Sequence, residues 1–206
     1  MIRTPPPDER TRLSSASSLA DIVARQVTDL APLPIAAVSP DQSRVLDLPV
    51  GWLLAAAGDS ADHPVRVVVT GHRSRGGWEG CETLAAFSFT GPAPIDTVIG
   101  SAACTLNDLN ASGITRQTLA TAELSDACAV RASGYLTALG LRIWAQFSTY
   151  LAGSNEVGCG RLIQHSLLVT TQRRTQLRTD IAVLSDTIHR AFCAMIDTRS
   201  RHDDRH

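Results

Sequence analysis

The stretch Leu124–Leu151 constrains the fold of this chain more than any other, because two alternating runs of residues flank a short turn. Alternation with period two is typical of β-strands. Gly140 ends the tripeptide between the runs and can supply the positive φ that a short hairpin loop needs. The sequence therefore predicts a long antiparallel hairpin with one apolar face, formed by Cys128, Val130, Ala132, Gly134 and Leu136 in the first arm and by Ile143, Ala145, Phe147, Thr149 and Leu151 in the second.

The opposite face of this hairpin carries large aromatic side chains among polar ones. Tyr135 of the first arm lies on it, together with Trp144 and Tyr150 of the second. Apolar walls with a few polar edges are typical of ligand sites, so these three residues are the candidate ligand-binding residues. The alternative interpretation is that they pack beneath a covering helix.

The composition indicates an ordinary globular protein. Of 206 residues, 44% are hydrophobic and 19% are charged, which is typical of a folded chain rather than a disordered one. The net charge of −1 predicts no general attraction to nucleic acid or to an anionic membrane surface. We expect a single domain over residues 17–196, with a disordered N-terminal tail at 1–16 and a disordered, charged C-terminal tail at 197–206.

The cysteines are odd in number, and no two of them show the CxxC spacing of metal or redox motifs. We therefore expect free thiols rather than a disulfide framework. The sequence shows neither the apolar core of a signal peptide nor a run near the ~18 apolar residues of a membrane helix. As it stands it predicts a cytoplasmic protein without a transmembrane segment, whereas a start further upstream would allow the cell envelope or secretion. The five thiols are Cys81, Cys104, Cys128, Cys159 and Cys193.

Helical and strand periodicities follow one another in the order helix, three strands, helix, four strands, helix. Ser18 offers an N-cap for the first helix, and Pro32 is expected to end it. Strands joined by short turns pair antiparallel, and amphipathic helices need a sheet face to cover. The predicted class is α+β: an α/β/α sandwich whose central, largely antiparallel sheet has about six or seven strands, with helices on both faces. Beyond the first helix and the hairpin we expect strands at Val45–Leu54, Val65–Thr70, Thr83–Thr90, Ile114–Glu123 and Arg161–Thr171, and helices at Pro94–Asn110 and Thr175–Ile196.

Four segments carry a family resemblance through their order along residues 18 to 195. They look like an opening helix, a Pro-Gly-Trp strand, a strand with a Gly-Pro turn and a helix, and a central hairpin. In this order they resemble the mycobacterial LpqN/LpqT-type lipoprotein family. The segments are SLADIVARQVT at Ser18–Thr28, LPVGW at Leu48–Trp52, FTGPAPIDTVIGSAACTLNDLN at Phe89–Asn110, and the hairpin with Leu124-Ser125, Ser133-Gly134-Tyr135, Gly140, Arg142 and Ala145-Gln146.

The resemblance implies a fold and a broad class of function. The family has the Mog1/PsbP-like sandwich fold, and its members are typically exported and often lipid-anchored. It implies a non-enzymatic envelope protein that binds partners or lipidic ligands. The sequence departs from the family in one respect, because it shows neither an export signal nor a lipobox cysteine near its start.

The glycine-rich segment Gly71–Gly80, GHRSRGGWEG, is the second candidate functional region. Backbone amides and arginines can cradle anions, but the segment has neither the GxxxxGK[ST] nor the GxGxxG pattern of a phosphate loop. We prefer an exposed, partner-contacting connector, because an exposed tryptophan usually has something to cover. The candidate partner-binding residues are Arg73, Arg75 and Trp78.

No residue pattern indicates catalysis or metal binding. The chain has no HExxH or GxSxG motif and no conspicuous pair of carboxylates, and its HxxxH spacing, at His202 and His206, falls in the charged C-terminal tail. We expect His165, within a predicted strand, to be a hydrogen-bonded core or interface residue rather than a catalytic base. His202 and His206, with Asp203 and Asp204 between them, read as a charged tail rather than a metal site.

These observations predict a protein without enzymatic activity, metal or cofactor. The preferred hypothesis is a binding or accessory protein related to the LpqN family, with a lipidic ligand or an envelope-related protein partner. The alternative is a cytoplasmic protein–protein adaptor or assembly factor that uses the sheet edge or the loop 71–80. A hydrolase with a cysteine or serine nucleophile is a third and more distant reading.

Overall fold

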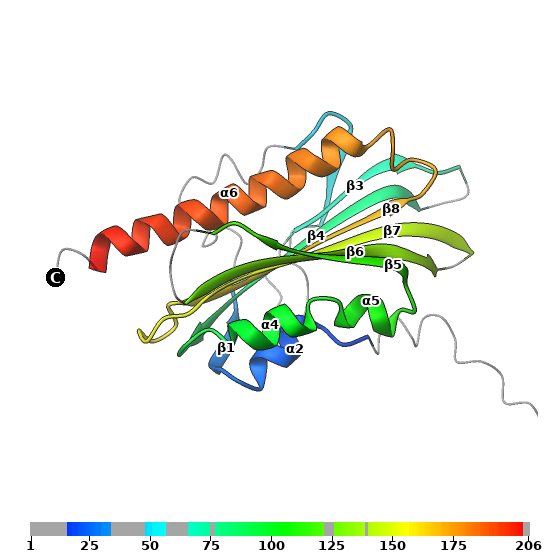
Figure 1. Cartoon of the computed structure of the whole chain (residues 1–206). Coiled ribbons are helices and arrows are strands. Elements are labelled where there is room, and N and C mark those ends of the chain that lie inside the picture. Colours follow the sequence, from blue (N-terminus) through cyan, green and yellow to red (C-terminus); the bar gives the residue numbers. More distant parts are fainter. Residues whose placement is uncertain are drawn as a thin grey trace, which may run out of the picture.

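A computed structural model describes residues 16–33, 48–56, 66–74, 77–121, 126–138 and 140–203 (Figure 1). Its helices and strands follow the predicted alternation closely. In chain order they are α2 (Leu19–Ala24), β1 (Thr28–Pro32), β2 (Trp52–Ala56), β3 (Arg66–His72), β4 (Trp78–Thr90), α4 (Ile95–Ser101), α5 (Cys104–Asp108), β5 (Ser112–Leu119), β6 (Ala127–Ala138), β7 (Leu141–Ala152), β8 (Gly160–Thr170) and α6 (Arg178–Asp203).

The described strands form one antiparallel sheet in the order β2-β3-β4-β8-β7-β6-β5. β4 pairs with β3 through its first half and with β1 through its last residues, so β1 continues the sheet where β3 has ended. The α+β class and the largely antiparallel sheet are thus confirmed. The sheet has eight strands among the described residues, against the six or seven predicted.

The central hairpin is the part of the fold that the sequence predicted best. β6 and β7 pair over their whole lengths, from Ala127 opposite Ala152 to Ala138 opposite Leu141. Gly140 in the turn has a φ of +72°, a conformation that glycine adopts without steric cost. The predicted hairpin is therefore confirmed, and the structure adds its register.

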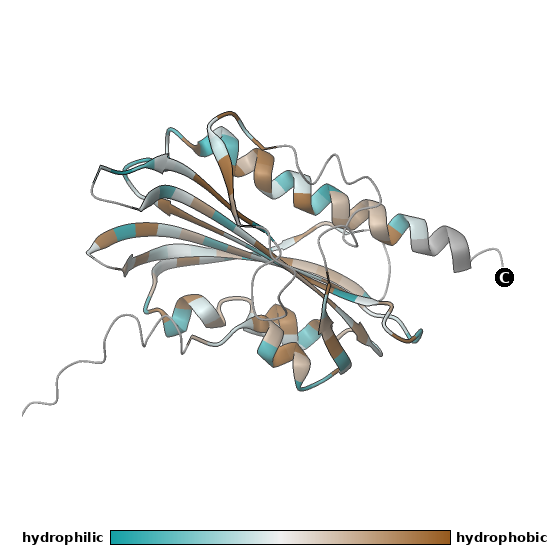
Figure 2. Ribbon diagram, turned by 180° about the vertical axis from the view of Figure 1, so that it is seen from behind, coloured by the Kyte–Doolittle hydropathy of each residue, from teal (hydrophilic) through white to brown (hydrophobic). Residues whose placement is uncertain are grey.

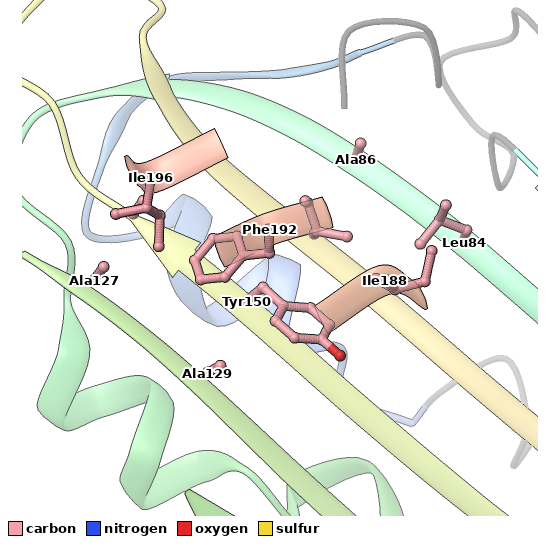
Figure 3. Packing of buried hydrophobic residues seen from close by; sticks show 10 residues of the cluster. Leu84, Ala86, Ala127, Ala129, Tyr150, Ile188, Phe192 and Ile196 are labelled. Atoms are coloured by element: carbon pink, nitrogen blue, oxygen red, sulfur yellow. The ribbon is translucent and has the colours of Figure 1, made fainter. Parts of the chain in front are cut away.

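Helices pack against the sheet through two large apolar clusters. Tyr150 and Leu151 are neighbours on β7, so their side chains leave the sheet on opposite sides. Tyr150 packs against Phe192 of α6, and Ile188 and Ile196 extend this cluster along the helix (Figure 3). Leu151 packs with Val23 of α2 and Val98 of α4, which lie across the sheet from α6 in Figure 1. Figure 2 shows apolar and polar bands interleaved along α6, as one buried and one exposed face require.

The first predicted helix is shorter than its periodicity suggested. Ser18 caps α2 through a capping box with Asp21, as the sequence predicted, but the helix ends at Ala24. Residues 28–32 form β1 instead, with Thr28 opposite Thr90. Val27 and Leu30 still pack against the α2–α4 cluster, because the extended backbone brings these side chains to the same core that a helix would have reached.

Two further helix boundaries differ from the predictions. The helix predicted at Pro94–Asn110 is split into α4 and α5 by a turn at Ala102 and Ala103. α6 continues to Asp203, although a tail was predicted from residue 197. No proline or glycine interrupts the sequence of α6, so no local signal stops the helix at residue 196.

Residues 1–15 of the predicted N-terminal tail lie outside the described residues. None of the described helices is long and apolar enough to cross a membrane.

Candidate ligand-binding site

Two of the three predicted ligand-binding residues lie side by side. Tyr135 on β6 and Trp144 on β7 are directly opposite one another in the hairpin, so their side chains emerge on the same face of the sheet. Trp144 is only 6% exposed, whereas Tyr135 is partly buried. Both pack in the cluster that includes Leu177, which precedes α6, and Ile181 within it.

Two arginines cover this aromatic pair. The guanidinium carbon of Arg174 lies 4.8 Å from the centre of the Trp144 ring and 5.4 Å from that of Tyr135, and Arg174 donates a hydrogen bond to the Tyr135 hydroxyl. Arg142, from β7, lies 5.6 Å from the Tyr135 ring centre. These are cation–π distances. We call Tyr135, Arg142, Trp144 and Arg174 the arginine–aromatic cluster.

Hydrogen bonds from several elements hold the arginines in place. The hydroxyl of Ser112 on β5 accepts from Arg142 Nη2 at 3.4 Å. Thr171, directly after β8, donates its N–H and its hydroxyl to the carbonyl oxygen of Arg142, at 3.0 and 3.2 Å. Arg173 forms an ion pair of 2.6 Å with Glu79 of β4. The segment that carries Arg174 is therefore tied to two strands.

Tyr150, the third predicted ligand-binding residue, lies in the core and not in this cluster. It is fully buried beneath α6, with its ring centre 5.3 Å from that of Phe192 (Figure 3). Its hydroxyl has no hydrogen-bond partner within the described part of the chain, although Arg131 and Ser148 are nearby. Burial raises the pKa of Tyr150, and the charge of Arg131 opposes that rise only in part. Tyr150 therefore packs beneath a covering helix, which is the alternative interpretation given in the sequence analysis.

Tyr150→Phe should therefore leave the stability unchanged or raise it by up to about 1 kcal/mol, because an unsatisfied buried hydroxyl is costly. Tyr135→Phe is the matched control. It should lower the free energy of unfolding by about 1 kcal/mol, because Arg174 loses its hydrogen-bond acceptor. Urea unfolding of both variants measures the two effects, and a destabilised Tyr150→Phe variant would show that the hydroxyl has a partner after all.

The candidate partner-binding residues lie at the end of the β3–β4 hairpin. Trp78 is 41% exposed and its ring meets that of His72 edge-on, with centres 5.4 Å apart. Arg73 donates its backbone N–H to the carbonyl oxygen of Gly77, which closes the turn. Arg75 lies outside the described residues. Exposed apolar side chains continue onto the neighbouring edge strand β2 and the residues before it, at Val50, Leu53 and Leu54.

A buried polar triad lies on the same sheet face as Trp144. Glu82 is 0% exposed and accepts from Arg66, with Nε to Oε2 at 3.0 Å and Nη2 to Oε1 at 2.6 Å. His165 Nε2 lies 2.9 Å from Glu82 Oε1. Burial works to raise the pKa of Glu82, but the hydrogen bond and charge of His165, and then those of Arg66, outweigh it and hold the pKa below its usual value. The expectation that His165 is a hydrogen-bonded core residue is confirmed, whereas the sequence reasoning missed Arg66 and Glu82.

No disulfide joins any of the five cysteines, all of which lie in the described part of the chain, as their number and spacing predicted. Cys193 has a histidine near it, since its sulfur lies 3.8 Å from His189 Nε2 one turn back on α6. Burial nevertheless raises the pKa of Cys193, and it raises that of Cys128 to about 11, so neither thiol is held as the reactive thiolate. Among the described residues, no group of three or more His, Cys, Asp or Glu is placed to hold a metal ion.

Comparisons with known proteins show a similarity of fold. No family model matches the sequence, and no curated protein matches it. A solved structure does: LpqN of Mycobacterium tuberculosis, described as involved in cell envelope biogenesis, with a TM-score of 0.60 over 84% of this chain and 96% of that one. The fold is LpqN-like. Because the two sequences are only 15% identical, the similarity concerns the fold alone. It confirms, at that level, the resemblance seen in the sequence.

Proposed function

We propose that this protein is a non-catalytic binding or accessory protein that takes its ligand at the arginine–aromatic cluster. The observation that carries the proposal is the convergence of Arg142 and Arg174 on the Tyr135–Trp144 pair. Tryptophan, tyrosine and arginine are the residue types that dominate the binding energy of protein surfaces. The LpqN-like fold supports an accessory role connected with the cell envelope, which is the process given for LpqN itself.

The chemistry of the polar groups supports a role in binding rather than in catalysis. Glu82 and His165 are the strongest acid–base pair described, and both are buried where a substrate would have no access. The Cys193–His189 pair carries a thiol whose pKa is raised, the opposite of what a cysteine nucleophile needs. A binding protein requires neither group to be accessible.

The second candidate function is that of a protein–protein adaptor. It is favoured by exposed apolar side chains at one edge of the sheet, with Leu53 59% and Leu54 52% exposed on the edge strand β2 and Trp78 41% exposed at the start of β4. Large exposed apolar residues close together are typical of surfaces that contact a partner. In this proposal the partner would lie along β2 and the β3–β4 turn.

Native mass spectrometry of the purified protein distinguishes the two candidates. A ligand-binding accessory protein is expected to carry a small molecule whose occupancy falls in Trp144→Leu and is retained in Trp78→Leu. An adaptor is expected to be ligand-free and to recover a stoichiometric protein partner from cell extract in a manner that depends on Trp78. Loss of turnover of any substrate on changing Cys193 or His165 would contradict both candidates.

A further inference from the structure

The arginine–aromatic cluster holds hydrogen-bond donors that its own contacts leave unused. The guanidinium carbon of Arg174 lies 4.8 Å from the centre of the Trp144 ring, and the group gives one N–H to the Tyr135 hydroxyl. Arg142 donates to the hydroxyl of Ser112 at 3.4 Å, a long contact. A guanidinium carries five N–H donors, so one hydrogen bond leaves most of them for an oxyanion. Both arginines therefore have donors available for a further partner.

No carboxylate of the described residues neutralises the cluster. Glu79, the acidic residue that reaches the Arg174 segment, is paired with Arg173 at 2.6 Å. Asp180, in the first turn of α6, accepts a hydrogen bond of 3.0 Å from the indole of Trp52. Neither Arg142 nor Arg174 has an ion-pair partner within the described ranges of the chain. Two positive charges thus lie against one tyrosine ring, with no counter-charge among the described residues.

The two arginines are also held before any ligand binds. The backbone of Arg142 belongs to β7 and receives two hydrogen bonds from Thr171, three residues before Arg174. The Arg173–Glu79 ion pair fixes the same segment from the side of β4. Preorganised donors lose less conformational entropy on binding than flexible ones, which raises the affinity for an anion.

We propose that Arg142 and Arg174 bind the phosphate group of an anionic ligand, with Tyr135 and Trp144 beneath it. The inference rests on the proposed function and adds the chemical class of the ligand. It is compatible with a net charge of −1 for the whole chain, because the attraction is local to this cluster. The anion can belong to a lipid headgroup or to a free phosphate compound.

The test uses a double variant and a control of equal charge. Arg142→Gln/Arg174→Gln removes both donors, whereas Arg25→Gln/Arg190→Gln makes the same change at exposed positions on α2's C-cap and on α6. Inorganic phosphate is titrated by calorimetry, and vesicles of phosphatidylcholine with and without phosphatidylglycerol are tested by sedimentation. We expect at least about tenfold weaker anion binding in the cluster variant and no such loss in the control.

The source of the anion follows from which probe binds. Binding to phosphatidylglycerol vesicles but not to inorganic phosphate identifies a lipid headgroup, and binding to inorganic phosphate identifies the phosphate group itself. Either result supports the proposal if the cluster variant loses it. Equal binding by the two variants, or wild-type protein that binds neither phosphate nor phosphatidylglycerol beyond phosphatidylcholine, overturns it.

Failure of this inference is distinguishable from failure of the proposed function. Native mass spectrometry could show a neutral ligand that is retained in Arg142→Gln/Arg174→Gln and lost in Trp144→Leu. That result would refute the proposal that the ligand is an anion, but it would support the proposal that a ligand binds at the cluster. A protein with no ligand at the cluster in any of these measurements would refute the proposed function as well. Circular dichroism and urea midpoints of both variants confirm that they are folded.

Discussion

Glu82→Gln is expected to lower the free energy of unfolding by about 3 kcal/mol or more, the usual cost of removing one partner from a buried ion pair. The substitution keeps the shape of the side chain and removes its charge. Arg66, 3% exposed, then loses the carboxylate that accepts from both Nε and Nη2. The amide offers one acceptor oxygen in place of two, so it cannot serve both Arg66 Nε and the position 2.9 Å from His165 Nε2 as an acceptor. Urea unfolding measured near neutral pH gives the difference.

The effect of Glu82→Gln should depend on pH in a defined direction. The pKa of Glu82 is held below its usual value in the folded protein, so folding favours the ionised form. The stabilisation is fully present above the unfolded-state pKa of about 4.3 and is lost as the pH falls through the folded-state pKa. The gap in stability between the wild type and Glu82→Gln should therefore be widest above about pH 5 and should narrow in acid.

Two further variants make this prediction specific. Glu156→Gln changes an exposed glutamate in the β7–β8 loop and should alter stability by less than about 0.5 kcal/mol. Arg66→Met/Glu82→Leu replaces the pair by apolar side chains and should cost less than Glu82→Gln alone, because it removes both charges of the pair together. A Glu82→Gln variant as stable as Glu156→Gln would show that the triad contributes little.

The sheet was predictable where local pattern and tertiary pairing agree. Along β6 and β7 the period-two alternation assigns each side chain to its face, and the structure keeps that assignment from Ala127 to Ala152. The pattern failed after Ala24, where Val27 and Leu30 are spaced as in a helix but residues 28–32 pair with β4. The end of α6 was missed for the opposite reason, because no residue there signals a stop.

Only part of the candidate site could be predicted from the sequence. Tyr135 and Trp144 could be placed on one face because they belong to one hairpin. Arg174 could not, because it reaches Tyr135 from the turn after β8, and the course of that turn depends on how α6 packs. Arg66 and Glu82 did leave a signal that was not used. Each is a charged residue within a buried strand, and such residues rarely stand without a partner.

Phe192→Ala should be the most destabilising apolar truncation on α6, by about 3–5 kcal/mol, since it opens a cavity in a fully buried site. Phe192 is 0% exposed and packs against Tyr150, between Ile188 and Ile196 on the same helix (Figure 3). Little of this volume can be refilled, because Ala127 and Ala129 on the facing strand are too short to reach it. The loss is measured by urea unfolding and by the melting temperature.

Val183→Ala is the matched control, because Val183 lies on the same helix and is 41% exposed. It should change stability by less than about 0.5 kcal/mol. Phe192→Leu should lie between the two, since leucine fills part of the volume of the ring. This order of effects, Phe192→Ala above Phe192→Leu above Val183→Ala, is expected only if α6 is held to the sheet by its buried face. Equal losses at Phe192 and Val183 would instead mean that α6 contributes through helix propensity alone, and the helix would then be separable from the sheet.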